Sequence, residues 1–169
     1  MAAISVTAAA QSTTQVLTAD HMLDVRSGRL VNKPSILIRD GRIVEVAGNG
    51  SSVNAPADAK RIDLPGMTLL PGLIDMHVHL DSDPLYGGYT GLQFGDRFWS
   101  MLMVPQAEKT LLAGFTTVRN VGSDAWNDVG LMQAIDERKI QGPRIVPATY
   151  SFGATGGHCD STYFPPSME

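Results

Sequence analysis

The sequence contains very little cysteine, no long apolar run and no block of charge of one sign. Its single cysteine, Cys159, excludes an intrachain disulfide and leaves the redox compartment open. No stretch approaches the roughly eighteen apolar residues that a membrane-spanning helix needs. The 13 basic and 17 acidic residues give a net charge of −4 without clustering. We therefore expect no nucleic-acid partner and no membrane partner.

What the sequence does contain is the composition of an ordinary globular protein. It has 169 residues, of which 43% are hydrophobic, enough for a sizeable core. Residues 1–14 are small and polar, which predicts a disordered tail. Their alanine content also fits the remnant of a signal-peptidase site, although the basic and apolar segments of a signal peptide are missing. A cytoplasmic and an exported location both stay open.

The pattern of elements changes near Met67. Residues 15–66 predict short strands joined by tight turns, with an Asp40-Gly41 hairpin turn; these include strands at 35–39, 42–46 and 60–64, the last ending before Pro65-Gly66. From Met67 onward, strands alternate with helices, which predicts βα units and a parallel sheet in an α/β fold. The expected strands are 68–78, 115–118 and 144–150, and the expected helices are 97–113 and 127–139.

Three local signals refine the helices and strands of this second part. Pro105 should kink or restart the first helix, and Gly114 suits its C-terminal cap. Asn127 or Asp128 is the expected N-cap of the second helix. Pro147 inside the third strand indicates a bulge.

The most informative stretch is Asp75-Met-His77-Val-His79. Alternate residues of a strand share a face, so His77 and His79 should point to the same side. The points where their side chains attach to the backbone should lie roughly 6–7 Å apart. The apolar residues 69–74 before them predict a buried strand, and α/β barrels place their chemistry at the C-terminal ends of such strands. Two histidines at this spacing also occur by chance on exposed strands. Unpaired polar groups are costly to bury, however, so we favour metal ligation, with Zn²⁺ the default.

Asp75 shares the parity of the two histidines and should lie deeper along the same face. It could orient a ligand histidine without touching the metal itself. The alternative is a polar residue whose carboxylate is satisfied by backbone or water.

Four segments resemble the amidohydrolase superfamily: Pro71–His79, Ala113–Gly122, Gly142–Tyr150 and Thr155–His158. The resemblance covers roughly residues 15–160. The last of these segments, Thr155–His158, is similar to the subgroup of imidazolonepropionase-like hydrolases, Xaa-Pro and Arg/Lys-Xaa dipeptidases, and bacterial ochratoxin-degrading amidohydrolases. The resemblance implies a partial (β/α)₈ TIM barrel, the first three βα units in 67–169, preceded by part of a small β-sandwich in 15–66. A complete barrel takes about 250 residues, so we expect this to be its N-terminal portion.

The resemblance implies a metal-dependent hydrolase that cleaves a C–N bond of a dipeptide-like or N-acyl amino acid substrate, ochratoxin-type amides included. One alternative is hydrolysis of a cyclic, imidazolone-type amide. Another is a non-catalytic fragment or subunit that needs the remainder of the barrel polypeptide. The expected partners are therefore a small-molecule amide or dipeptide and the rest of the barrel, with the full enzyme a homo-oligomer.

The resemblance also implies one or two Zn²⁺ ions. A second metal would need a carboxylated bridging lysine, which the family takes from a later barrel strand. No lysine of this sequence stands at a matching strand end; they are Lys33, Lys60, Lys109 and Lys139. We assign no catalytic residue beyond the metal ligands, because the family's general base also comes from a later strand.

His158 follows the third strand and two glycines, so it should lie on the same side as the metal pair. The resemblance implies that it binds the substrate, at a carbonyl oxygen or a carboxylate. The alternative is a loop histidine bonded to backbone. Arg119 could bind a substrate carboxylate, but we favour a structural ion pair, for instance with Asp124.

The loop after the first barrel strand has two further features. Asp81 and Asp83 are expected to be solvated. An aromatic cluster follows, which fits either an apolar wall over the pocket or ordinary loop packing; its members are Tyr86, Tyr89, Phe94, Phe98 and Trp99.

Overall fold

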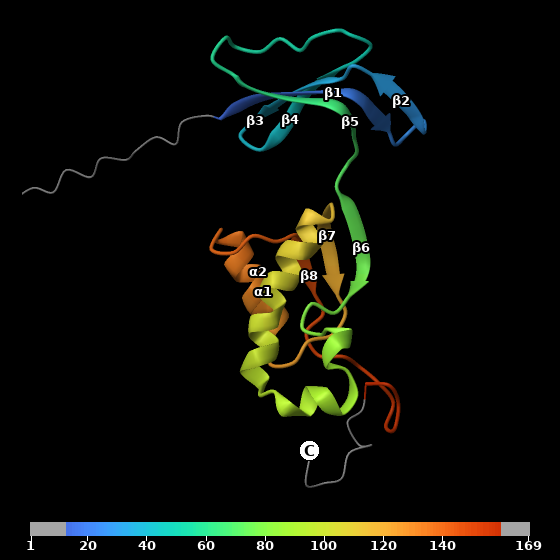
Figure 1. The fold of residues 1–169 in the computed structure, drawn as a ribbon, viewed down its shortest axis with the longest axis vertical. Coiled ribbons are helices and arrows are strands. Elements are labelled where there is room, and N and C mark those ends of the chain that lie inside the picture. The colour runs from blue at the N-terminus through green and yellow to red at the C-terminus, as the bar shows by residue number, and fades with distance from the viewer. Residues whose placement is uncertain (1–12, 160–169) are drawn as a thin grey trace, which may run out of the picture. The chain divides into compact units, whose positions relative to one another are not determined.

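The structure is a computed structural model that describes residues 13–159, apart from the side chain of Tyr89 (Figure 1). The chain divides into two compact units, Met1–Pro71 and Gly72–Glu169. Most of the expected N-terminal tail, residues 1–12, lies outside the described residues, and Thr14 already begins a strand. Within the described part, none of the helices has the length and apolar character required to cross a bilayer.

The first unit is a single five-stranded sheet. Strands β2, β1, β3 and β4 pair in that order with antiparallel neighbours, and β5 pairs in parallel with β1. A small core that includes Val16 and Leu37 packs on this sheet. The bounds are β1 Thr14–Asp24, β2 Arg29–Asn32, β3 Ser35–Arg39, β4 Arg42–Ala47 and β5 Lys60–Leu69.

The turn residues predicted the β3–β4 connection of this sheet correctly, but they gave the wrong end for β5. The β3–β4 hairpin turns at Asp40 and Gly41, whose φ angles of 51° and 73° are the two left-handed residues such a turn requires. The expected end of β5 before Pro65-Gly66 is wrong. Gly66 instead adopts a φ of 75° within the strand and donates its N–H to Asp20 Oδ2 at 3.0 Å, next to an irregularity in the β1–β5 pairing.

The second unit contains the predicted βα pattern. Three parallel strands, β6 Leu73–Val78, β7 Phe115–Asn120 and β8 Arg144–Pro147, form a sheet in chain order. The first of them begins at Leu73, not at residue 68, because Met67–Leu69 belongs to β5. The boundary between the units accordingly follows Pro71, five residues after the expected one at residue 66.

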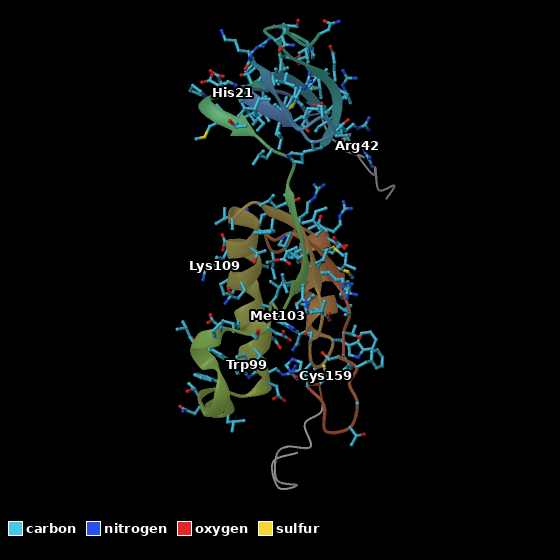
Figure 2. All side chains as sticks on the ribbon, turned by 90° about the vertical axis from the view of Figure 1, so that its right-hand side faces the viewer. His21, Arg42, Trp99, Met103, Lys109 and Cys159 are labelled. Carbon is cyan, nitrogen blue, oxygen red and sulfur yellow. The ribbon has the colours of Figure 1, made fainter. Side chains whose placement is uncertain are left out.

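Two helices lie side by side along one side of this sheet: α1 Asp96–Leu112, after the short helices η1 Pro84–Tyr86 and η2 Gly88–Gln93, and α2 Asn127–Asp136 (Figure 1). Their shared core with the strands contains Leu80, Met103, Ala107, Val118, Leu131 and Ile145. Figure 2 labels Met103, which is only 1% exposed, in the interior of this unit. Burial of this apolar cluster holds the strand ends in place.

Three local expectations for this unit are corrected. Of the two effects expected of Pro105, a restart of the helix is wrong, because α1 runs through Pro105 as one element, while a kink stays a prediction. Gly114, at a φ of 98°, ends the helix as expected. The N-cap of α2 is Trp126, in left-handed backbone, and neither Asn127 nor Asp128. The pairing of β7 with β8 shows no bulge at Pro147, which is the last residue of its strand.

Candidate metal centre at the end of strand β6

The two predicted ligands lie together at the C-terminal end of β6. His77 is the penultimate residue of the strand, and His79 follows its last residue, Val78. The centroids of their imidazole rings are 5.5 Å apart, with the ring planes at 70°. Two imidazoles bound to one tetrahedral zinc have centroids about 5 Å apart, given zinc–nitrogen bonds of about 2.0–2.1 Å. The donor type and the spacing therefore both fit a divalent ion.

Among the described residues, no other polar group bonds to either imidazole of this pair. Within residues 13–159, no hydrogen bond engages the side chain of His77 or His79. In the same range, no group of three or more His, Cys, Asp or Glu side chains is arranged to hold a metal. A metal site built on this pair would need at least one more protein group.

Asp75 contacts the backbone of the metal-binding segment. Its Oδ1 accepts the N–H of His77 at 3.0 Å. The pairing of β6 with β7 is irregular between Asp75 and Val78, so the strict alternation used to place Asp75 on the histidine face is interrupted. The carboxylate therefore holds the main chain at His77 and makes no hydrogen bond to an imidazole.

Hydrogen bonds from β7 fix the main chain on both sides of His79. Val121 donates its N–H to the carbonyl of Val78 at 3.0 Å. Leu80 donates its N–H to Oδ1 of Asn120 at 2.9 Å. The sequence gave no sign of a role for Asn120, because its bond to Leu80 joins residues that are 40 positions apart.

A glycine after β7 borders the ring of His79. A Cβ placed on Gly122 would lie 3.4 Å from Cε1 of His79 and would collide with the hydroxyl of Ser151. Gly122 is buried, and Ser151 comes from the loop after β8. The loops that follow three neighbouring strands therefore converge beside this imidazole, as expected for the C-terminal end of a parallel sheet.

His158 lies in the loop after β8 and is exposed. This loop folds on itself, because Gly157 donates its N–H to the carbonyl of Ala154 at 2.8 Å and Gly153 lies against Cys159. Figure 2 shows Cys159 and Trp99 at the same end of the unit, the end toward which the three strands run. In the described part of the chain, no ring contact or hydrogen bond links His158 to the histidine pair.

Arg119 does not form the ion pair that the sequence favoured. It is exposed, and none of the described acidic residues, Asp124 included, lies within ion-pair distance of it. Asp124 instead lines a cavity of about 520 Å³ between the loops after β6 and β7; the cavity is lined by Asp81, Ser82, Asp96, Trp99, Asp124, Ala125 and Asn127. Arg119 therefore remains available to an anionic group.

The loop after β6 is more ordered than its composition predicted. Asp81 accepts a hydrogen bond from the Ser123 hydroxyl at 2.7 Å, and Asp83 accepts one from Gln106 Nε2 at 2.9 Å, so the expectation of solvated carboxylates is wrong. The aromatic side chains of this loop and of the start of α1 pack on one another; they are Tyr86, Phe94, Phe98 and Trp99. Phe94 and Phe98 are stacked, with ring centroids 4.2 Å apart, and the other contacts are edge-to-face. Tyr89 was expected in this cluster, but its side chain lies outside the described part.

The family model for the amidohydrolase family matches residues 68–165, which is more than half of the sequence. The chain belongs to the amidohydrolase family. The recognised resemblance is therefore confirmed, and the mixed α/β unit that carries His77 and His79 belongs to the TIM-barrel superfamily. Members of this family are generally metal-dependent.

Two relatives illustrate the range of activities in this family. The chain is 36% identical to a dihydroorotase from Geotalea daltonii over 101 residues, 56% of this chain and 20% of that protein. It is 29% identical to an imidazolonepropionase from Streptomyces coelicolor over 128 residues, 73% of this chain and 31% of that protein.

Two solved structures share the fold. A Xaa-Pro dipeptidase with bound methionine in its active site is 31% identical with a TM-score of 0.77, covering 89% of this chain and 36% of that one. The Aspergillus niger ochratoxinase matches with a TM-score of 0.73 at 20% identity, covering 94% of this chain and 36% of that one, and supports the fold alone. The chain thus spans roughly a third or less of the length of these amidohydrolases.

Proposed function

We propose that this chain forms the N-terminal part of a metal-dependent amidohydrolase in which His77 and His79 are two ligands of Zn²⁺. The observation that carries the proposal is the pair of imidazoles 5.5 Å apart at a strand end. In the described part of the chain, no hydrogen bond occupies either ring. In this proposal the barrel begins in the second unit, and the first unit contributes to a small β-sandwich.

Each residue at this site has a distinct part in the proposed chemistry. When bound, the metal ion supplies Lewis acidity, which makes water nucleophilic near neutral pH and polarises the scissile carbonyl. His77 and His79 contribute neutral imidazole nitrogens, and Asp75 fixes the main chain of this segment through its bond to the His77 N–H. The remaining ligands, the general base and any bridging carboxylated lysine come from the rest of the barrel polypeptide.

The proposed reaction is hydrolysis of an amide C–N bond in a dipeptide-like or N-acyl amino acid substrate, ochratoxin-type amides included. The likeness to a Xaa-Pro dipeptidase, 31% identical with a TM-score of 0.77, supports this substrate class. His158 binds the carbonyl oxygen or carboxylate of the substrate in this proposal, since it lies in the loop that follows the C-terminal end of β8. A carboxylate beside the scissile bond also matches the free guanidinium of Arg119.

The test is a metal-depletion assay on the complete enzyme. Xaa-Pro dipeptides, N-acyl amino acids and ochratoxin are offered to the protein before chelation, after chelation and after zinc is restored. Turnover of at least one of these amides should disappear on chelation and return with zinc. Undiminished turnover by metal-free enzyme would contradict the proposal.

A second candidate keeps the metal and changes the substrate to a cyclic amide of the imidazolone type. The relationship to an imidazolonepropionase over 73% of this chain supports it. Ring opening and linear amide cleavage, measured side by side on the same preparation, separate the two candidates. Faster ring opening favours the cyclic substrate.

A third candidate is that the chain acts only as a fragment or subunit together with the remainder of the barrel. Strand β6 leaves large apolar side chains exposed, including Ile74 at 62% and Met76 at 58%. Such a strand at a sheet edge favours aggregation of the isolated chain. Mass spectrometry should detect a companion or longer polypeptide, and size analysis should find a homo-oligomer of the full enzyme. A monomeric, cooperatively folded isolated chain would contradict this candidate.

A further inference from the structure

A single buried amide lies where the chain segments around the histidine pair meet. Asn120 is the last residue of β7 and is 0% exposed. Its Oδ1 accepts the N–H of Leu80 at 2.9 Å, and its Nδ2 donates to the carbonyl of Gly122 at 3.0 Å. Both polar ends of the side chain are therefore used inside the protein, where unpaired groups are costly.

Both partners of this amide are next to His79, one along the chain and the other beside its imidazole ring. Leu80 is the next residue along the chain and is anchored in the core at 4% exposure. Gly122 borders the ring itself, since a Cβ on this glycine would lie 3.4 Å from His79 Cε1. One side chain therefore sets both the main chain after the ligand and the surface against which its ring rests.

The main chain at Asn120 extends this connection to the third strand. Its carbonyl accepts the N–H of Ala148 at 3.0 Å, directly after β8. The neighbouring Val121 donates to the carbonyl of Val78, on the other side of His79. Asn120 thus joins the ends of all three described barrel strands at the level of the candidate metal centre.

We propose that Asn120 is a positioning residue for His79: its carboxamide holds this imidazole in the orientation that binds the metal. The inference rests on the proposed function. Its physical basis is that groups holding a ligand's orientation contribute to metal affinity without touching the metal. An amide suits this place because it accepts from Leu80 and donates to Gly122 at the same time, which neither a carboxylate nor a hydrophobic side chain can do.

The test measures zinc affinity of the complete protein by competition with a chromophoric chelator. Asn120→Ala loses both bonds and should raise the zinc dissociation constant about 10–100-fold. Asn120→Asp keeps an acceptor for Leu80 and loses the donor to Gly122, so its dissociation constant should lie between those of wild type and Asn120→Ala. In the metal-free protein, the backbone N–H of Leu80 should exchange its hydrogen with solvent faster in Asn120→Ala than in wild type, and this increase should be much smaller in Asn120→Asp.

The matched control is Val118→Ala, two residues earlier on the same strand. Val118 is also 0% exposed but belongs to the apolar core and makes no side-chain bond to the His79 segment. It should lower thermal stability and leave zinc affinity unchanged.

If Asn120→Ala fails to fold, Asn120→Asp decides the question alone, and it should bind zinc more weakly than Val118→Ala does. Zinc affinities of the Asn120 variants equal to that of Val118→Ala would overturn the positioning role. A wild-type protein that binds no zinc would instead overturn the proposed function on which it rests.

Discussion

Histidines on strands have different environments in the two units. In the first unit, His21 of β1 lies opposite Asn32 of β2, and its Nδ1 is 3.1 Å from the Asn32 side-chain oxygen. In the second unit, His77 and His79 face each other at the end of a parallel strand, and no other described side chain bonds to them. A histidine within an antiparallel pair can bond to the residue opposite it on the next strand, whereas His77 and His79 at the end of a parallel strand contact each other.

Removal of either histidine of the pair should have the largest effect, and it tests the contrast between His21 and the pair. His77→Ala or His79→Ala in the complete enzyme should abolish stoichiometric zinc binding and lower amide hydrolysis roughly 1,000-fold, because a metal contributes several kcal/mol to transition-state stabilisation. His21→Ala is the matched control and should keep both zinc content and turnover. Equal losses of zinc and of turnover in His77→Ala, His79→Ala and His21→Ala would contradict this difference between the histidines of the two units.

A smaller effect is expected from crowding the His79 ring. Gly122→Ala places a methyl group against Ser151 and His79 and should destabilise the fold by about 1–3 kcal/mol. It should also weaken zinc binding about tenfold, because groups that hold a metal ligand in place contribute to metal affinity. Chemical denaturation and zinc titration measure the two effects.

The control for this substitution is Gly130→Ala, at a position in helix α2 with nothing within 4 Å of the added carbon. That change should stabilise the protein by about 0.5–1 kcal/mol and leave zinc binding unaltered. A Gly122→Ala protein with normal zinc affinity would show that Gly122 does not support the ligand.

Damage to the first unit should affect stability without affecting the metal. Gly41 adopts a φ of 73° in the β3–β4 turn, so Gly41→Ala should cost about 1–2 kcal/mol of folding free energy. Zinc affinity should stay at the wild-type value, since this turn and the histidine pair belong to different compact units. Thermal unfolding and zinc titration of the same preparation provide the comparison, and a parallel fall in both would contradict it.

The smallest expected effect concerns one carboxyl group of the first unit. A hydrogen bond from the Ser27 hydroxyl lowers the pKa of Asp24 below its ordinary 3.8, and a hydrogen bond from the Arg26 N–H lowers it by a smaller amount. Because the folded pKa is depressed, its small contribution to stability is present above pH 3.8 and is lost as pH falls through the folded pKa. Ser27→Ala should raise the pKa of Asp24 toward 3.8 in an NMR titration; an unchanged value would exclude this hydroxyl as the main cause.

Sequence patterns predicted the features of this chain that depend on local chemistry. The alternating strands and helices from residue 73 onward, the Asp40-Gly41 hairpin and the glycine end of α1 follow from periodicity and backbone preference. The i, i+2 spacing of His77 and His79 predicted that they lie close together, and the ring contact confirms this although His79 follows the last residue of β6.

The features that sequence patterns missed depend on contacts between distant residues. Strand β5 continues through Pro65-Gly66 because Asp20, far along the chain, accepts the N–H of Gly66. Asp81 bonds to Ser123, 42 residues away, so its loop position gave no sign of that partner. The role of Asn120 likewise arises from a bond to Leu80 across 40 residues, and an asparagine at a strand end carries no such signal by itself.

The most direct test of the metal centre is X-ray absorption spectroscopy on the zinc-loaded complete protein. At least two imidazole nitrogens are expected about 2.0–2.1 Å from the zinc. In His77→Ala and in His79→Ala, loaded at high zinc concentration, the spectrum should show one imidazole fewer. A spectrum with the same number of imidazole nitrogens in wild type and both variants would contradict this expectation.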